Sequence, residues 1–129
     1  MTDKIIIKDL KVFAYHGVNE EEKINGQNFV LDVTLYLSLE KACLTDDIND
    51  TVSYAKVSKL VLKVMTEKSY NLLECAASNV ALRIMNEYPC VASVKVCLKK
   101  PEAPIKADFS YMAVEIVRSR SDYDEASSN

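Results

Sequence analysis

The stretch FVLDVTLYLSL, residues 29–39, decides the fold because its apolar and polar residues alternate. Every odd position carries a large apolar side chain, while Asp32, Thr34 and Ser38 stand at even positions. A period of two places one set of side chains on one face of a β-strand. Val30 and Tyr36 interrupt the polar set. The pattern therefore predicts a long strand with one buried face and a second face that is not strongly polar.

A first strand is expected before this one, at about residues 4–15, ending in FAYHG. The intervening segment VNEEEKINGQ, residues 18–27, is long for a hairpin loop and holds three consecutive glutamates. Such a loop is either simply solvated or has a function.

Two helices and two further strands follow. Apolar residues at helical spacing predict helices over residues 54–68 and from about residue 71 to residue 87, where Tyr88-Pro89 stops the second helix. Strands are expected near residues 91–100 and 109–118. The order ββααββ predicts an α+β fold, a four-stranded antiparallel sheet with both helices on one face. The other face and the sheet edges stay open, so we expect an oligomer.

Length and composition point to one cytoplasmic domain. The chain has 129 residues, 49% of them hydrophobic and 27% charged, with a net charge of −3. That charge argues against a nucleic-acid partner, and no apolar run is long enough to span a membrane. Four irregularly spaced cysteines are typical of reduced thiols rather than of a disulfide framework. We expect residues 1–118 to form the domain and 119–129, SRSDYDEASSN, to be a disordered polar tail.

The sequence predicts neither a metal nor a cofactor. His16 is the only histidine, no cysteine stands near it, and a lone histidine is more often structural than a ligand. The only two glycines, Gly17 and Gly26, cannot form a phosphate-binding loop.

Two adjacent lysines end the third expected strand, in VKVCLKK, residues 94–100. Lys100 shares the parity of the apolar residues, and Lys99 shares that of the polar ones. We therefore expect Lys99 to point to water and its substitution to matter little. Lys100 should end the buried face, where lost hydration suits a lysine for proton transfer. The alternative is that Lys100 merely extends its ammonium to solvent.

Other candidate residues also have structural alternatives. Asn71 and Glu74, in NLLE, fit a capping box, although a carboxylate at a helix start can also bind a heterocycle with adjacent NH donors. Tyr54 is either a core or rim residue or a phenol that delivers a proton. Glu22 and the two glutamates before it are either solvated or functional.

Four segments together resemble dihydroneopterin aldolase, a family of folate-biosynthesis enzymes. They are FAYHGVNEEEKINGQNFVLDV, LTDDINDTVSYAKV, NLLECAASNVA and KKPEAPI, and they cover residues 13–105 in the order and spacing of that family. The resemblance implies the tunnelling fold shared with GTP cyclohydrolase and pyruvoyltetrahydropterin synthase. It also implies a homotetrameric ring or a homo-octamer of two rings, with active sites between neighbouring subunits.

The resemblance also implies roles for individual residues. Lys100 matches the catalytic lysine, Tyr54 the catalytic tyrosine, and Glu22 the loop glutamate that reaches the substrate. Glu74 matches the carboxylate that holds the pterin amino group and ring NH, and Leu73 offers backbone contacts to the ring. The implied reaction is a metal-free, cofactor-free retro-aldol cleavage of dihydroneopterin, with some side-chain epimerisation.

Two alternatives stay open at this point. A related epimerase would invert a side-chain hydroxyl of dihydroneopterin, or of its triphosphate, without cleavage, and Lys106 slightly favours a phosphate. A catalytically silent pterin-binding assembly protein is the other alternative. The chain departs from the family after Ile105, where Lys106-Ala107-Asp108 replaces the usual Pro-Gly before an aromatic residue. Losing that turn glycine changes the loop beyond Lys100.

Overall fold

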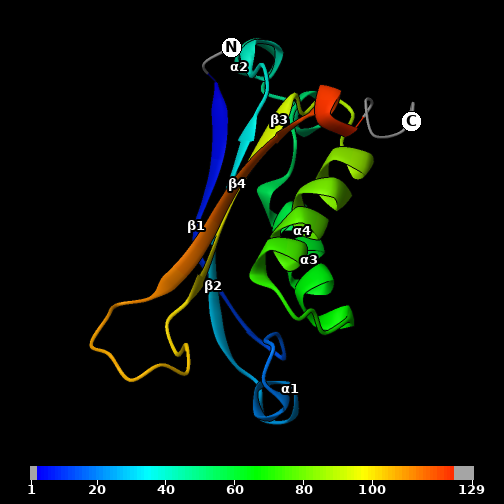
Figure 1. The fold of residues 1–129 in the computed structure, drawn as a ribbon. Coiled ribbons are helices and arrows are strands. Elements are labelled where there is room, and N and C mark those ends of the chain that lie inside the picture. The colour runs from blue at the N-terminus through cyan, green and yellow to red at the C-terminus, as the bar shows by residue number, and fades with distance from the viewer. Residues whose placement is uncertain (1–2, 124–129) are drawn as a thin grey trace.

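Four antiparallel strands form one sheet in the order β1-β2-β3-β4, and α3 and α4 cover one of its faces (Figure 1). The computed structural model describes residues 3–123. Its elements are β1 Lys4–Ala14, α1 Glu20–Asn25, β2 Gln27–Tyr36, α2 Glu40–Thr45, a 3-10 turn Ile48–Asp50, α3 Tyr54–Glu67, α4 Leu73–Glu87, β3 Ser93–Lys100 and β4 Met112–Ser119. The α+β class and the ββααββ order of the long elements are confirmed. No helix within residues 3–123 has the length and hydropathy needed to cross a bilayer.

The alternation in β2 produces the buried face that it predicts. Phe29, Leu31, Val33 and Leu35 are fully buried beneath the helices. The helices present complementary apolar stripes, and α4 contributes three alanines, whose small side chains let the helix lie close to the sheet. The buried helix residues are Val57, Val61, Val64 and Met65 of α3 and Ala76, Ala77, Val80, Ala81, Ile84 and Met85 of α4.

A β-bulge in β1 changes which residues face the helices. Ile7 pairs with Val33 and Leu10 with Leu31, so Lys8 and Asp9 together stand opposite a single residue of β2. Asp9 has a φ of 55°, in the left-handed region that a non-glycine residue rarely adopts. The sequence pattern did not reveal this extra residue, because the bulge interrupts the alternation on which strand prediction relies.

Two short helices were not predicted. The segment expected as a loop contains α1, whose first turn consists of Glu20, Glu21 and Glu22, and acidic residues stabilise a helix N-terminus. The segment after β2 contains α2, which begins at Glu40, and β2 ends at Tyr36, three residues before the expected end of the strand. Both helices have six residues, too few for a clear helical period in the sequence.

The ordered domain extends beyond the predicted boundary at residue 118. Ser119 ends β4, and residues 120–123 are helical. The Arg120 guanidinium donates to the carbonyl oxygens of Met85, Tyr88 and Val91, at distances of 2.7 to 3.2 Å, and so binds the end of α4. Regular structure therefore extends to residue 123, five residues beyond the predicted domain boundary. Residues 124–129 lie outside the described residues.

We expect Leu31→Ala to destabilise the protein by about 2–5 kcal/mol, because Leu31 is 0% exposed and its removal leaves a cavity at the centre of β2. The matched control is Leu44→Ala in α2, where the leucine is 81% exposed and its loss should change stability by less than about 0.5 kcal/mol. Urea unfolding followed by circular dichroism measures both. Equal losses in the two variants would contradict the core described here.

Candidate active site

Lys100 and Glu22 form an ion pair at one end of the sheet. Lys100 is the last residue of β3, and Glu22 lies in the first turn of α1. Both are shielded from solvent, since their side chains are 11% and 7% exposed. Lys100 is therefore not a surface lysine that extends into water. The arrangement brings together a cation and an anion that can act as acid and base at the same point.

The Glu22 carboxylate is held by three donors from three parts of the chain. Oε1 accepts a hydrogen bond from the Asn19 backbone NH at 3.3 Å, and Oε2 accepts one from Gln27 Nε2 at 3.0 Å in addition to the contact with Lys100. Burial alone would raise the pKa of Glu22, but the bonds from Lys100, Gln27 and Asn19 outweigh it and lower that pKa. Glu22 is therefore ionised near neutral pH.

Gly17 makes room for this carboxylate. A Cβ at Gly17 would lie 2.4 Å from the Glu22 carboxyl carbon, a distance that would force the carboxylate out of place. Gly17 also has a φ of +152°, which side chains disfavour, and its NH donates to the Tyr70 carbonyl oxygen at 3.0 Å. The Gly17 position in YHGVNEE is thus required by the close approach of Glu22.

His16 is structural, as its isolation in the sequence indicated. The ring is fully buried, with Nδ1 accepting the Tyr70 NH at 3.0 Å and Nε2 within 2.9 Å of the Met65 carbonyl oxygen. Only a neutral ring with its proton on Nε2 satisfies both contacts. Burial lowers the pKa of His16 and favours that neutral form. The histidine thereby fixes the end of β1 to the segment between α3 and α4.

Leu73 and Glu74 begin α4 close to this segment. Glu74 is exposed and Leu73 half-buried, so the carboxylate is open to a ligand. The capping box predicted for Asn71 and Glu74 is wrong. The helix is preceded by Leu72, no side chain caps it, and the Asn71 side-chain oxygen instead accepts a hydrogen bond from the Lys23 ammonium. Through Lys23, the α4 segment is joined to α1, which carries Glu22.

Tyr54 lies away from Lys100 and Glu22 within this chain. It starts α3, is 68% exposed, and lines an apolar pocket with Ile5 and Leu39. Ile5 pairs with Leu35, whereas Lys99 pairs with Val30, and five residues of β2 separate those two levels by roughly 17 Å. One chain therefore brings Lys100 and Glu22 together but does not bring Tyr54 to them.

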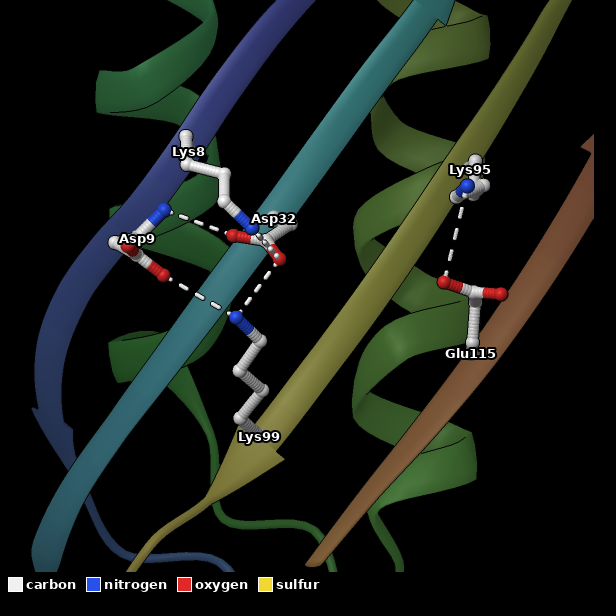
Figure 2. A network of polar contacts seen from close by, with 6 residues as sticks. All are labelled: Lys8, Asp9, Asp32, Lys95, Lys99 and Glu115. Atoms are coloured by element: carbon white, nitrogen blue, oxygen red, sulfur yellow. Dashed lines mark hydrogen bonds and ion pairs between the residues drawn. The ribbon is translucent and has the colours of Figure 1, made fainter. Parts of the chain in front are cut away.

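The parity of Lys99 predicted that its side chain points into water, and the structure shows that it does not. It does lie on the sheet face opposite the helices, but the residue is only 9% exposed there. Figure 2 shows the reason. Its ammonium lies 2.8 Å from Asp32 Oδ2 and 3.2 Å from Asp9 Oδ1. It also lies 5.2 Å from the centre of the Tyr111 ring. The expectation that Lys99 points into water is therefore wrong.

Asp32 is the centre of this second network. Besides Lys99, it accepts the Asp9 NH at 2.8 Å and contacts the Lys8 ammonium at 3.2 Å (Figure 2). Burial would raise the pKa of Asp32, but the bonds from Lys99, Asp9 and Lys8 lower it to about 2. The hydrogen bond that Lys99 donates to Asp32 is the main reason why the pKa of Lys99 is raised. Both groups are therefore charged throughout the physiological pH range.

Sequence reasoning missed Gln27 and Asn19 as members of the site. Both hold Glu22, and Gln27 is only 8% exposed. The spacing from Asn19 to Glu22 matches a helix cap followed by a third-position glutamate, a signal that was available. The contact between Gln27 and Glu22 had no such signal, because it depends on how α1 folds back onto the start of β2.

The chain matches known proteins along nearly its whole length. The family model described as FolB, dihydroneopterin aldolase, matches residues 5–117. A dihydroneopterin aldolase of Methylorubrum extorquens is 39% identical over 122 residues, which cover 95% of this chain and 94% of that protein. Dihydroneopterin aldolase 2 of Arabidopsis thaliana is 39% identical over 121 residues, covering 93% of this chain and 92% of that protein.

A solved structure has the same fold. It is the crystal structure of E. coli dihydroneopterin aldolase in complex with neopterin. The two chains superimpose with a TM-score of 0.84 at 28% identity, over 92% of this chain and 100% of the other.

We expect Asp32→Asn to lower the free energy of unfolding at pH 7 by about 1–2 kcal/mol. The reason is that the pKa of Asp32 is about 2 in the folded protein, whereas the ordinary value, which applies to the unfolded chain, is 3.8. A lowered pKa stabilises the fold above pH 3.8, and that contribution is lost as the pH falls through 2. Urea unfolding at pH 7, 4 and 2.5 should therefore show a weaker acid dependence in the variant.

The control for this measurement is Glu115→Gln on the same sheet face. Glu115 is 54% exposed and lies 3.9 Å from Lys95, so its loss should cost less than about 0.5 kcal/mol. An acid dependence that is unchanged in Asp32→Asn would show that the network around Lys99 does not form.

Proposed function

The chain belongs to the dihydroneopterin aldolase family, and we propose on that basis that it cleaves 7,8-dihydroneopterin into 6-hydroxymethyl-7,8-dihydropterin and glycolaldehyde. The buried ion pair of Lys100 and Glu22 is the observation that carries this proposal. A shielded acid and base at one point are what a proton-transfer reaction needs. The neopterin complex of the E. coli relative supports a pterin as the ligand.

The chemistry requires proton transfers and an electron sink. A retro-aldol reaction breaks the bond between the first and second side-chain carbons, as the second hydroxyl loses its proton and becomes the aldehyde of glycolaldehyde. The electrons of the broken bond move into the ring imine conjugated with the first carbon, which yields an enol. Protonation of that carbon restores the imine and gives the hydroxymethyl product. The substrate itself therefore supplies the electron sink, and the protein moves protons.

We assign these transfers to the ion pair. Because the lowered pKa of Glu22 keeps it ionised, the resting pair is an ammonium and a carboxylate. The carboxylate side of the pair receives the hydroxyl proton, directly or through water, and the Lys100 ammonium donates to the ring imine nitrogen. Gln27 and the Asn19 NH keep the carboxylate oriented during the exchange. Gln27 Oε1 is buried without a hydrogen-bond partner among residues 3–123, and is placed to accept from a bound donor.

The pterin ring is assigned to the start of α4. The Glu74 carboxylate is exposed there and can accept hydrogen bonds from the amino group and the adjacent ring NH. The backbone of Leu73 offers further contacts in the first turn of the helix, where NH groups lack helical partners. This assignment is supported by the contacts of Lys23 with Asn71 and of Gly17 with Tyr70, which join the α4 segment to the part of the chain that carries Glu22.

Tyr54 is assigned to the site of a neighbouring subunit, where it protonates the enol. Its distance from Lys100 within one chain supports this assignment. The sheet has two open edges, β1 and β4, which can pair with the β4 and β1 of neighbouring chains to form a closed ring. A homotetramer, or two stacked tetramers, would thus combine Lys100 and Glu22 of one subunit with Tyr54 of the next.

Epimerisation follows from the same intermediate. If glycolaldehyde turns before it leaves, recombination with the enol forms the opposite configuration at the second carbon. We therefore propose epimerase activity as a side reaction that uses the same Lys100 and Glu22. Chromatographic separation of the two epimers in the aldolase reaction mixture measures it.

We expect Lys100→Ala to lower kcat by about 10²–10⁴-fold, because it removes the group that exchanges protons with the substrate. Binding of neopterin, measured by calorimetry, should stay within about threefold of wild type, since Glu74 and Leu73 hold the ring. The production of glycolaldehyde from dihydroneopterin is the measurement. An active Lys100→Ala enzyme would refute the assignment.

A mixture of two inactive variants tests the shared site. Lys100→Ala and Tyr54→Phe, refolded together at equal concentrations, should regain about a quarter of wild-type activity, since about one interface in four joins an intact Lys100 to an intact Tyr54. Each variant refolded alone is the control. Activity no higher than the sum of the two controls would contradict a site built by two subunits.

A further inference from the structure

Lys99 has no part in the proposed chemistry, yet its side chain is held by several contacts on the open face of the sheet. Its ammonium contacts three other strands or strand ends. Asp9 comes from β1, Asp32 from β2, and Tyr111 immediately precedes β4. We call these four residues, Lys99, Asp9, Asp32 and Tyr111, the Lys99 clamp.

The clamp depends on the bulge in β1. The extra residue turns Asp9 toward Lys99 and directs the Asp9 NH to Asp32 Oδ1 at 2.8 Å. Asp9 adopts a φ of 55°, a conformation that costs free energy for a residue with a side chain. The contact of the Asp9 carboxylate with Lys99 and the hydrogen bond from the Asp9 NH to Asp32 hold Asp9 in this conformation. A strained residue held by several contacts is more typical of a positioned site than of a simple surface ion pair.

The clamp acts on the residue next to it. Lys99 and Lys100 are consecutive, so their side chains leave the strand on opposite faces. Lys99 anchors the end of β3 on the open face, and Lys100 contacts Glu22 on the other. A shift of the backbone at Lys99 therefore moves the Lys100 ammonium relative to Glu22.

The clamp also closes the loop of residues 101–111, which starts beside Lys100. Lys100 pairs with Met112 across the base of this loop, and the Lys99 ammonium lies over the ring of Tyr111 on the returning side. Glu102 fixes the outgoing side, because its carboxylate accepts the Asn28 NH at 2.9 Å. This is the loop in which Lys106-Ala107-Asp108 replaces the glycine-containing turn. The contact with Tyr111 restrains a loop that lacks that turn.

We propose that Lys99 is a positioning residue for the aldolase reaction, which sets the reach of Lys100 by anchoring the end of β3 through Asp9, Asp32 and Tyr111. This inference rests on the proposed function. It predicts that loss of the clamp impairs the proton transfers of Lys100 but leaves ring binding at Glu74 intact. The signature is a fall in kcat without a matching rise in KM.

The test compares Lys99→Met, Lys99→Arg and Lys95→Met as intact oligomers, with folding checked by circular dichroism at the assay temperature. Lys99→Met keeps most of the length of the side chain but removes its charge. It should lower kcat about tenfold, because a small misplacement of a catalytic group has a large effect on rate. KM for dihydroneopterin and the dissociation constant of neopterin should stay within about twofold of wild type. Lys99→Arg, which keeps the charge, should recover most of the lost kcat.

Lys95→Met is the matched control, because Lys95 lies on the same strand and the same face as Lys99. Its side chain is 38% exposed, and its contact with Glu115 is long, at 3.9 Å (Figure 2). Its kcat should equal that of wild type. The inference is overturned if Lys99→Met keeps the wild-type kcat, if Lys95→Met loses as much, or if Lys99→Arg recovers nothing. If Lys99→Met does not fold, Asp9→Asn decides in its place, since asparagine tolerates the positive φ and removes one charge.

Asp9→Asn should lower kcat about threefold, again with KM unchanged. The effect is smaller because this variant removes only one of the two carboxylates that contact Lys99. An unchanged kcat in that variant overturns the inference. The proposed function itself fails separately, if the wild-type protein releases no glycolaldehyde. If the wild-type enzyme is active and all clamp variants have the same kcat, only the role of Lys99 is refuted, and the proposed function stands.

Discussion

The burial of one sheet face beneath α3 and α4 is the constraint on which the rest of the structure depends. Because side chains alternate along a strand, a shift of one residue would expose the whole apolar set of β2. The register is therefore fixed, and it also determines where the two lysines at the end of β3 lie. Lys100 continues the buried face and contacts Glu22, whereas Lys99 lies on the opposite face with Asp9 and Asp32.

The two faces solve the same electrostatic problem in different ways. An ion removed from water costs several kcal/mol unless it is paired and hydrogen-bonded. At the candidate active site, Glu22 pairs with Lys100 and accepts hydrogen bonds from Gln27 and from the Asn19 NH, and these contacts keep the pair charged. On the other face, Asp32 pairs with Lys99 and Lys8 and accepts a hydrogen bond from the Asp9 NH. These contacts lower the pKa of Asp32, so it stays charged. In the proposed reaction the first pair exchanges protons with a substrate, whereas the second network anchors the end of β3.

The separation of Tyr54 from Lys100 links the fold to its assembly. An antiparallel sheet of four strands places the start of α3 and the end of β3 at different levels, and no side chain spans that distance. In the proposed ring of subunits, the open edges β1 and β4 pair between neighbouring chains, and a neighbour supplies the tyrosine. In that proposed arrangement, catalysis depends on oligomerisation.

The sequence by itself determined the fold class, because the period-two pattern of residues 29–39 and the helical stripes of α3 and α4 are local signals. It also placed Lys100 on the buried face, since parity is a local property, and its motifs identified the family. It did not reveal that Lys99 is covered, that Gln27 holds Glu22, or that the first turn of α4 lacks a side-chain cap. Those facts depend on a bulge in β1, on α1 folding back onto β2, and on Lys23 reaching Asn71. Contacts between residues far apart in the chain leave no periodic trace in the sequence, and so only the tertiary structure decided them.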